Sequence, residues 1–262
     1  MTDTVLQGVR ALVLDIDGVL YHAGQPIPGA QEALTEIRQR DLPIRFLTNI
    51  TRRSPGNIAR YLQGMGYAIT PGEILTASSL AAKYLRGQGR PRCWVLLEGD
   101  GMGQFAGLEL TEEDPDYVVL GDLREKFTYD LLNRVLAALW KGAGFLAMQA
   151  DPYDLALGGS GPKVNVGAWL ALLERASGRQ ATLIGKPAAI AFRMALDELG
   201  VPASEAAMVG DRVESDVVGG QSAGMRTVLL RTGHFRPEDL ETSAVQPSLV
   251  IDSLADLPRF LP

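Results

Sequence analysis

The stretch VLDIDGVLY, residues 13–21, places an apolar segment directly before two aspartates, Asp15 and Asp17. Burying a carboxylate costs several kcal/mol unless a counter-charge or a metal ion stabilises it. The groups that stabilise these two acids must therefore come from other parts of the chain. Gly18 follows the second aspartate, and a glycine there permits the turn that brings main-chain carbonyls close to a ligand.

Three further apolar runs end on polar groups in the same way as residues 11–15. They are residues 44–49, 181–186 and 206–211. Nearly continuous apolar runs are typical of strands buried on both faces of a parallel sheet. Segments with helical periodicity lie between these runs. The alternation predicts an α/β fold with a Rossmann-like, doubly wound parallel sheet.

A second series of strands and helices occupies the middle of the chain. The expected strands are residues 92–97, 117–122 and 145–150, and the expected helices are residues 129–140 and 167–176. None of these strands ends on the set of polar groups that marks the other four. We therefore predict an inserted α/β domain at residues 79–181, carried by a discontinuous core of residues 1–78 and 182–262.

The composition restricts the classes of partner. The 262 residues are 46% hydrophobic and 21% charged, with a net charge of −6, which does not favour a nucleic-acid or membrane surface. The single cysteine, Cys93, excludes an internal disulfide and fits a reducing cytoplasm. The first ten residues show no apolar leader, and no apolar stretch approaches the roughly 20 residues of a membrane helix. We expect a cytoplasmic protein.

The polar groups at the four strand ends predict one site. Ligands of open α/β sheets bind at the carboxyl ends of the strands, where these groups would meet. The expected groups are Asp15 and Asp17, Thr48 and Asn49, Lys186, and Asp211 with Asp216. Carboxylates beside a lysine and a hydroxyl indicate a phosphoryl group together with Mg²⁺, whose preferred ligands are oxygens.

These motifs carry a resemblance to a known family. DIDGVLY (15–21), LTN (47–49), GKP (185–187) and GDRVESD (210–216) resemble the four signatures of the haloacid dehalogenase (HAD) superfamily of phosphatases. The insertion after the second signature resembles the NagD-like subfamily IIA, which has a large α/β cap. PIPGAQEAL (26–34), RFLTNITRRS (45–54) and RTGHFRPEDLE (231–241) resemble the branch of phospholysine phosphohistidine inorganic pyrophosphate phosphatase and HAD hydrolase domain-containing protein 2.

The resemblance implies a role for each acid. Asp15 would be the nucleophile that forms an aspartyl-phosphate, and Asp17 would protonate the leaving group and then deprotonate water. Asp15, the main-chain carbonyl of Asp17, and Asp211 would bind Mg²⁺. Asp216 would orient Lys186 or a metal-bound water.

The resemblance also implies the substrate contacts. Thr48, the Asn49 main chain and Lys186 would bind the phosphoryl oxygens, with Gly18 beside them. Ile50 stands where many capped relatives have a second asparagine, and Thr51 restores a hydroxyl one residue later. Within residues 150–161, which resemble the substrate-specificity loop of the family, Asp151 and Tyr153 are the candidates for contact with the leaving group.

Other conspicuous residues have simpler interpretations. Residues 99–104, GDGMGQ, lack the strand–turn–helix context of a nucleotide site and are expected to form a loop or a helix start. His22 and His234 lie far apart in the sequence without metal-ligand partners, which favours surface or packing roles. Cys93 is expected to be a small apolar filler. Arg52 and Arg53 either border the phosphate site or are solvated, with solvation favoured.

The leading hypothesis is a Mg²⁺-dependent hydrolase of a small phosphorylated metabolite or pyrophosphate. Dehalogenation is disfavoured, because Asp17 supplies an acid that a halide leaving group does not need. The alternative from another class is a catalytically weak protein that binds a phosphometabolite or a partner through its cap. A closing cap favours small substrates, and the resemblance favours a homodimer formed through the cap.

Overall fold

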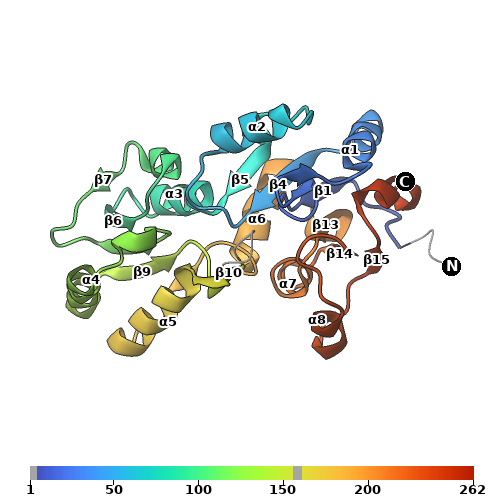
Figure 1. The fold of residues 1–262 in the computed structure, drawn as a ribbon. Coiled ribbons are helices and arrows are strands. Elements are labelled where there is room, and N and C mark those ends of the chain that lie inside the picture. Colours follow the sequence, from blue (N-terminus) through green and yellow to red (C-terminus); the bar gives the residue numbers. More distant parts are fainter. Residues whose placement is uncertain (1–4, 156–160) are drawn as a thin grey trace. The chain divides into compact units, whose positions relative to one another are not determined.

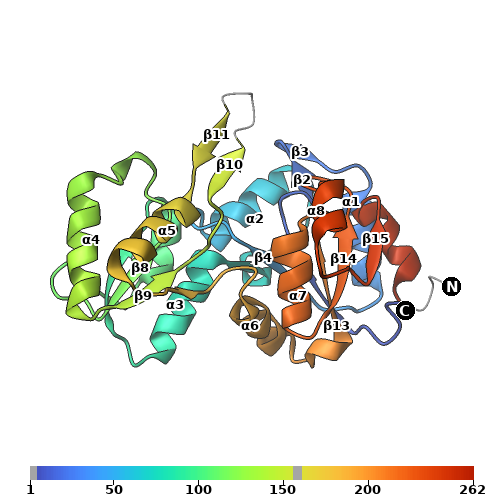
Figure 2. The same ribbon diagram turned by 90° about the horizontal axis from the view of Figure 1, so that it is seen from below.

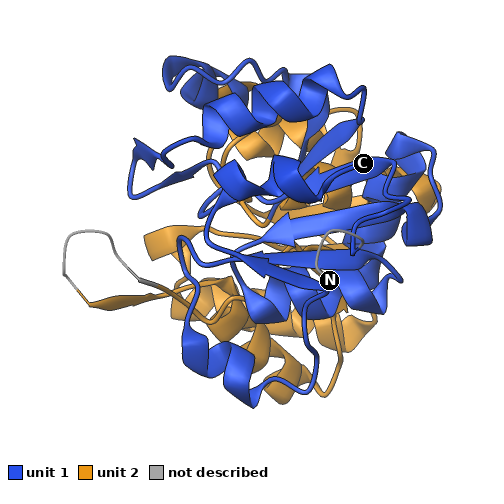
Figure 3. Cartoon of the chain, turned by 90° about the vertical axis from the view of Figure 1, so that its right-hand side faces the viewer, with its two compact units in different colours: residues 1–48, 58–75, 186–262 blue, residues 49–57, 76–185 orange. Residues whose placement is uncertain are grey.

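The computed structural model describes residues 5–155 and 161–262. The chain forms two compact units, coloured separately in Figure 3. Unit 1 comprises Met1–Thr48, Ile58–Leu75 and Lys186–Pro262, and unit 2 comprises Asn49–Asn57 and Thr76–Gly185. Each unit is built around its own sheet.

Unit 1 contains a six-stranded sheet in the order β15-β14-β13-β1-β4-β5 (Figure 1). The strands are β1 (Ala11–Leu14), β4 (Ile44–Thr48), β5 (Ile74–Thr76), β13 (Ala206–Gly210), β14 (Arg226–Leu230) and β15 (Leu249–Ile251). The strands from β15 to β4 pair in parallel, and every residue of β1 and β13 is buried. The chain winds outward in opposite directions from β1 and β13, so the switch point of this doubly wound sheet lies between them.

Amphipathic helices cover the sheet of unit 1. Helix α1 (Ala30–Gln39) buries the apolar face that its periodicity predicts and packs against the C-terminal 3₁₀ helix η6 (Leu254–Phe260). Helix α6 (Ala189–Leu199) packs against β1, β4 and the short helix α7 (Gly219–Ser222). Helix α8 (Pro237–Thr242) also belongs to unit 1. Helix α2 (Pro55–Gly64) begins in unit 2 and continues into unit 1 from Ile58.

Unit 2 contains a five-stranded sheet in the order β12-β9-β8-β6-β7, and all its pairings are parallel. Its strands are β6 (Arg92–Leu96), β7 (Glu109–Leu110), β8 (Tyr117–Leu120), β9 (Gly144–Ala147) and β12 (Thr182–Leu183). Its helices are α3 (Ala77–Gly87), α4 (Tyr129–Lys141) and α5 (Val166–Ser177). The three strands and two helices predicted for the middle of the chain are confirmed.

Two antiparallel ribbons supplement the sheets. In unit 1, β2 (Tyr21–His22) pairs with β3 (Gln25–Pro26) shortly after the two aspartates. In unit 2, β10 (Tyr153–Leu155) pairs with β11 (Pro162–Val164), and Figure 2 shows this ribbon extending away from α5. No helix in the described ranges has the length and apolarity needed to cross a lipid bilayer.

One strand prediction is wrong in its placement. Residues 181–186 were expected to form a strand of the sheet that carries the aspartates, but β12 covers only Thr182–Leu183 and pairs with β9 of unit 2. An apolar run this short predicts a strand without identifying its partner. Lys186 therefore follows a strand of the other sheet and is the first residue of the last segment of unit 1.

Candidate active site

Asp15 lies at the carboxyl end of β1 and is fixed there by the main chain. Its N–H donates to the Val209 carbonyl of β13 at 2.9 Å, and the Ile16 N–H donates to Asp15 Oδ1 at 2.8 Å. The carboxyl group is buried. Because β1 and β13 flank the switch point of the sheet, Asp15 occupies the position where open α/β sheets bind their ligands.

Lys186 bridges two carboxylates in the interior of unit 1. Its amine lies 2.9 Å from Asp15 Oδ1 and 2.7 Å from Asp216 Oδ1, and the residue is only 3% exposed. Asp216 belongs to the π-helical turn η5 (Val213–Val218), and its Oδ2 accepts the Arg212 N–H at 3.0 Å. Three residues predicted from separate motifs therefore meet through short, charge-assisted hydrogen bonds.

Asp211 completes the acidic cluster. It follows β13, is fully buried, and accepts the main-chain N–H of His234 at Oδ2. One oxygen from each of Asp15, Asp211 and Asp216 lies within 4.8 Å of the others. The cluster therefore combines acids from two adjacent strand ends and one helical turn.

Glycines leave the space that Asp211 occupies. A Cβ atom on Gly18, whose φ is +81°, would lie 2.0 Å from Asp211 Oδ2. A Cβ atom on Gly233, whose φ is +58°, would lie 2.2 Å from the same oxygen. Sequence reasoning identified Gly18 but missed Gly233 and also Thr232, whose hydroxyl donates to the Gly18 carbonyl. Both missed residues lie in the RTGHF segment, which served only to support the resemblance.

Burial dominates the electrostatics of the cluster. It raises the pKa of Asp15 to about 6, with Lys186 opposing the shift and Asp216 adding to it. Burial and the charges of Asp15 and Asp216 raise the pKa of Asp211 well above its ordinary value. Burial lowers the pKa of Lys186, but the two neighbouring carboxylates outweigh it and the net shift is upward. The lysine is therefore a permanent cation.

The donor atoms of the cluster fit a divalent cation. When Asp15, Asp211 and Asp216 are all ionised, the cluster carries three negative charges, and the ammonium of Lys186 balances one of them. Among the described residues, Asp211 Oδ1 is shielded from solvent and has no hydrogen-bond partner. Oxygen donors of this kind suit hard divalent cations, and a dication would balance the excess charge.

Thr48 and Asn49, which are adjacent in the sequence, belong to different units. Thr48 is the last residue of β4, the parallel neighbour of β1, and is buried. Asn49 belongs to unit 2, where a Cβ atom on Gly185 would lie 2.6 Å from its Oδ1. Gly185 thus permits a close approach one residue before Lys186.

Asp17 is half-exposed, unlike the buried acids. Its Oδ1 is 3.5 Å from His22 Nδ1, and His22 in turn contacts His234, with ring centroids 5.3 Å apart. The contact between the two rings agrees with the packing role expected for the histidines, but their separation in the sequence did not predict that the fold would bring both next to Asp17. Periodicity within short segments carries no information about such a long-range contact.

Asp151 and Tyr153 belong to unit 2. The Asp151 N–H donates to Gln149 Oε1 at 2.5 Å, and Tyr153 begins β10 with 46% of its surface exposed. Asn165 fixes the base of the ribbon by accepting from Gln149 at 3.0 Å and donating to Asp154 at 2.7 Å. Residues 156–160 of the predicted specificity loop lie outside the described residues. The assignment of Asp151 and Tyr153 to substrate binding stays a prediction.

The simpler interpretations of residues 99–104 and of Cys93 are confirmed in unit 2. Residues 100–105 form the 3₁₀ helix η2 in place of a nucleotide loop. Arg52, for which solvation was favoured, instead forms an ion pair with Glu98 at 2.6 Å. Cys93 is buried, and burial raises its pKa to about 11, so its thiol stays protonated at neutral pH. A protonated, enclosed thiol is an apolar filler and a poor nucleophile.

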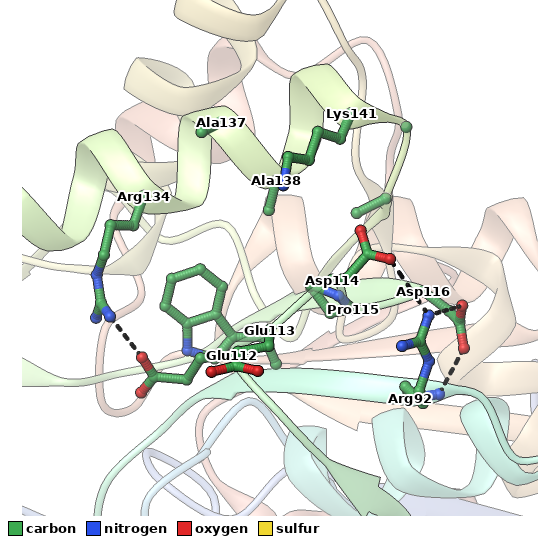
Figure 4. Close-up of a pocket in the computed structure, with 13 residues that line it drawn as sticks. Arg92, Glu112, Glu113, Asp114, Pro115, Asp116, Arg134, Ala137, Ala138 and Lys141 are labelled. Atoms are coloured by element: carbon green, nitrogen blue, oxygen red, sulfur yellow. Dashed lines mark hydrogen bonds and ion pairs between the residues drawn. The ribbon is translucent and has the colours of Figure 1, made fainter.

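A hollow of about 790 Å³ in unit 2 lies at the wrong end of its sheet to be the active site (Figure 4). It is lined by Arg92 at the start of β6, by Asp116 before β8 and by Ala143 before β9. Its charges largely pair with each other, as in the Arg134–Glu112 contact of 2.7 Å and the Arg92–Asp116 contact of 3.3 Å. Paired surface charges at the amino ends of strands do not make a catalytic centre.

Comparisons with known proteins match this geometry. A family model described as haloacid dehalogenase-like hydrolase matches residues 12–110, and one described as HAD-hydrolase-like matches residues 183–257. Phospholysine phosphohistidine inorganic pyrophosphate phosphatase from Rattus norvegicus is 34% identical over 96% of this chain and 93% of its own. Ribonucleotide monophosphatase NagD from Escherichia coli is 29% identical over 95% of this chain and 98% of its own.

A solved structure shares the whole fold. The 4-nitrophenylphosphatase from Thermotoga maritima superposes with a TM-score of 0.90 at 31% identity, covering 97% of this chain and 98% of that one. Fold and acidic site together define an α/β hydrolase that acts on phosphate groups. The chain belongs to the haloacid dehalogenase superfamily, in its NagD-like subfamily IIA.

Proposed function

We propose that this protein is a Mg²⁺-dependent phosphatase that hydrolyses a small phosphorylated metabolite or pyrophosphate through an aspartyl-phosphate. The observation that carries the proposal is the buried Lys186 amine, which contacts Asp15 and Asp216 at 2.9 and 2.7 Å beside an Asp211 oxygen without a hydrogen-bond partner among the described residues. This cluster has the excess negative charge that a dication would balance.

Asp15 is the proposed nucleophile. Its contact with Lys186 opposes the effect of burial on its pKa and so favours the ionised form that attacks phosphorus. Mg²⁺, held by Asp15, Asp211 and the main-chain carbonyl of Asp17, would neutralise the phosphoryl oxygens that otherwise repel a carboxylate. Lys186 places a fixed positive charge where negative charge develops, and Thr48 and the Asn49 main chain bind the phosphoryl oxygens.

Asp17 is the proposed acid and base. Its side chain is 43% exposed, in contrast to the buried Asp15, so it can exchange protons with solvent and with the leaving group. It protonates the leaving oxygen in the first step and deprotonates the attacking water in the second. Asp216 takes no part in bond making and positions the Lys186 amine.

The proposed substrate class is supported by the names of the relatives and by the cap role that we assign to unit 2. The relatives' names specify inorganic pyrophosphate, phospholysine, phosphohistidine and ribonucleotide monophosphates as their substrates. We assign unit 2 the role of a cap that limits access to small molecules, with Asp151 and Tyr153 contacting the leaving group. We also assign the protein to the cytoplasm, in keeping with its single cysteine, which is buried.

The test is phosphate release from a panel of phosphomonoesters, phosphoamides and pyrophosphate, with Mg²⁺ and with EDTA. We expect Mg²⁺-dependent turnover, and an acid-quenched reaction should yield a phosphorylated peptide containing Asp15. Trapping with beryllium fluoride should label the same carboxylate. Absence of turnover across the panel, with binding of a phosphometabolite retained, would favour the binding-protein alternative.

A further inference from the structure

The two histidines of the chain lie side by side although 212 positions separate them. His22 ends β2, and His234 follows β14, and their rings meet edge to face at an interplanar angle of 89°. Asp17 stands next to them, and one ligating atom of each of the three residues lies within 4.8 Å of the others. All three are partly buried and belong to unit 1.

Two of these atoms have unsatisfied hydrogen-bonding capacity. Within the described part of the chain, Asp17 Oδ1 and His22 Nδ1 are shielded from solvent without a hydrogen-bond partner. They face each other at 3.5 Å, which is longer than the 2.7–3.2 Å of an ordinary hydrogen bond. Ligand atoms about 2.0–2.1 Å from a tetrahedral zinc ion lie roughly 3.3–3.5 Å from each other. The separation therefore fits two ligands of one ion.

The donor types select the class of ion. Two imidazoles and one carboxylate suit Zn²⁺ and related transition-metal dications, whereas Mg²⁺ takes oxygen ligands. Three protein ligands leave a fourth tetrahedral position for water or for an oxygen of a bound phosphate. This set shares no side chain with the all-oxygen cluster of Asp15, Asp211 and Asp216.

We propose that Asp17, His22 and His234 form a second metal site, which binds Zn²⁺ or a similar ion and inhibits the enzyme. The inhibition rests on the proposed function, because it follows from the role of Asp17. A carboxylate oxygen that shares its lone pair with Zn²⁺ cannot pick up and deliver the proton that the leaving group needs. The nucleophile Asp15 and the buried lysine stay untouched.

The binding arm of the test does not depend on turnover. Metal-stripped protein in excess Mg²⁺ is titrated with Co²⁺ and with Zn²⁺, and binding is followed by calorimetry and by the visible absorption of Co²⁺. We expect one ion per chain that Mg²⁺ does not displace. Since the chain has only two histidines, NMR should show both imidazoles shifting with one midpoint. The Asp15→Asn variant should bind equally well.

Variants locate the site. We expect His22→Asn and His234→Asn each to weaken Zn²⁺ binding at least tenfold, whereas Asp114→Asn, at an exposed carboxyl of unit 2, should bind as the wild type does. Binding that Mg²⁺ abolishes, or that both histidine variants retain, would overturn the metal site.

The inhibition arm compares each protein with itself. In Mg²⁺ buffer, Zn²⁺ should suppress wild-type phosphate release with a midpoint equal to its dissociation constant, and the midpoint should rise at least tenfold in both histidine variants. Zn²⁺ that binds without suppressing turnover would refute the inhibitory role. A wild-type enzyme without any turnover would contradict the proposed function and the inhibition together, leaving the metal site to be decided by binding.

Discussion

The two sheets end in different electrostatic environments although both are parallel and built from β-α repeats. In unit 2, Glu98 after β6, Asp122 after β8 and Asp154 within β10 contact the cations Arg52, Arg124 and Lys126 at 2.6–3.8 Å. In this group, three acids contact three bases, so their charges balance. In unit 1, the cluster of three buried carboxylates contains one ammonium, that of Lys186, which contacts Asp15 and Asp216. Only the second arrangement calls for a further cation.

The difference extends to the titration of the acids. A hydrogen bond from Lys126 and the charge of Arg52 hold the pKa of Glu98 below its usual value despite some desolvation. Burial raises the pKa of Asp15 to about 6 even though Lys186 contacts it. In both parallel sheets, polar groups converge at the carboxyl ends of the strands. Only in unit 1 are these groups also buried and unbalanced in charge, which makes them candidates for catalysis.

Replacing the nucleophile should have the largest effect. We expect Asp15→Asn to lower phosphate release by a factor on the order of 10³ or more, because no covalent intermediate can form. Lys186 keeps its 2.7 Å contact with Asp216, so the fold should survive. Phosphate release and circular-dichroism melts measure the two effects. Activity close to that of the wild type would remove Asp15 from the mechanism.

The second-largest effect is expected from replacing a lysine, and it should destabilise the protein when the lysine belongs to unit 1 but not when it belongs to unit 2. Lys186→Met leaves Asp15 and Asp216 buried without their cation, and breaking a buried pair in this way costs about 3–5 kcal/mol. The matched variant Lys126→Met removes a lysine that is 67% exposed and should leave the denaturation midpoint unchanged within error. Urea unfolding of both variants provides the comparison. Equal shifts would show that burial does not distinguish the clusters.

Adding Mg²⁺ should stabilise the protein through unit 1. At a concentration about 100-fold above the dissociation constant, binding contributes about 2.7 kcal/mol, or roughly 5 °C or more in Tm for a chain of this size. Because burial raises the pKa values of Asp15 and Asp211, protons compete with the ion, and the gain should shrink as the pH falls through about 6. Thermal melts with and without EDTA at several pH values test this, and Asp211→Asn should lose the gain.

The smallest effect is expected at Glu98. Its pKa is lowered in the folded state, so its ion pairs stabilise the protein above the unfolded pKa, and this contribution is lost as the pH falls through the folded value. Glu98→Gln should therefore melt slightly below the wild type at pH 7 and together with it at acidic pH. A difference that grows on acidification would have the wrong sign.

Local patterns predicted much of the fold and of the site. Continuous apolar runs predicted β1, β4 and β13, and the four motifs predicted that their polar groups would meet; the structure shows Asp15, Lys186 and Asp216 in contact. These predictions are correct because the burial of a strand and the polar groups at its end depend on residues that are adjacent in the sequence.

The failures concern contacts between distant segments. The run at 181–186 predicted a strand but assigned it to the wrong sheet, because the hydrophobicity of a two-residue edge strand does not identify the strand it pairs with. The contact of His22 with His234 depends on where the segment after β14 returns to the ribbon β2–β3, and Gly233 is required only because Asp211 lies beside it. Such proximity is a property of the tertiary fold alone.

The pairing of β1 with β13 has a consequence for synthesis on the ribosome. Ala11 lies opposite Ala206 in this pair, so the strand that presents Asp15 gains its central neighbour only after most of the chain has been translated. Unit 2 draws nearly all its residues from one continuous segment, Thr76–Gly185, and emerges complete before that moment. Long-range parallel pairing is slow to form, so the acidic cluster is assembled late, and a nascent chain carries Asp15 as an ordinary solvated aspartate.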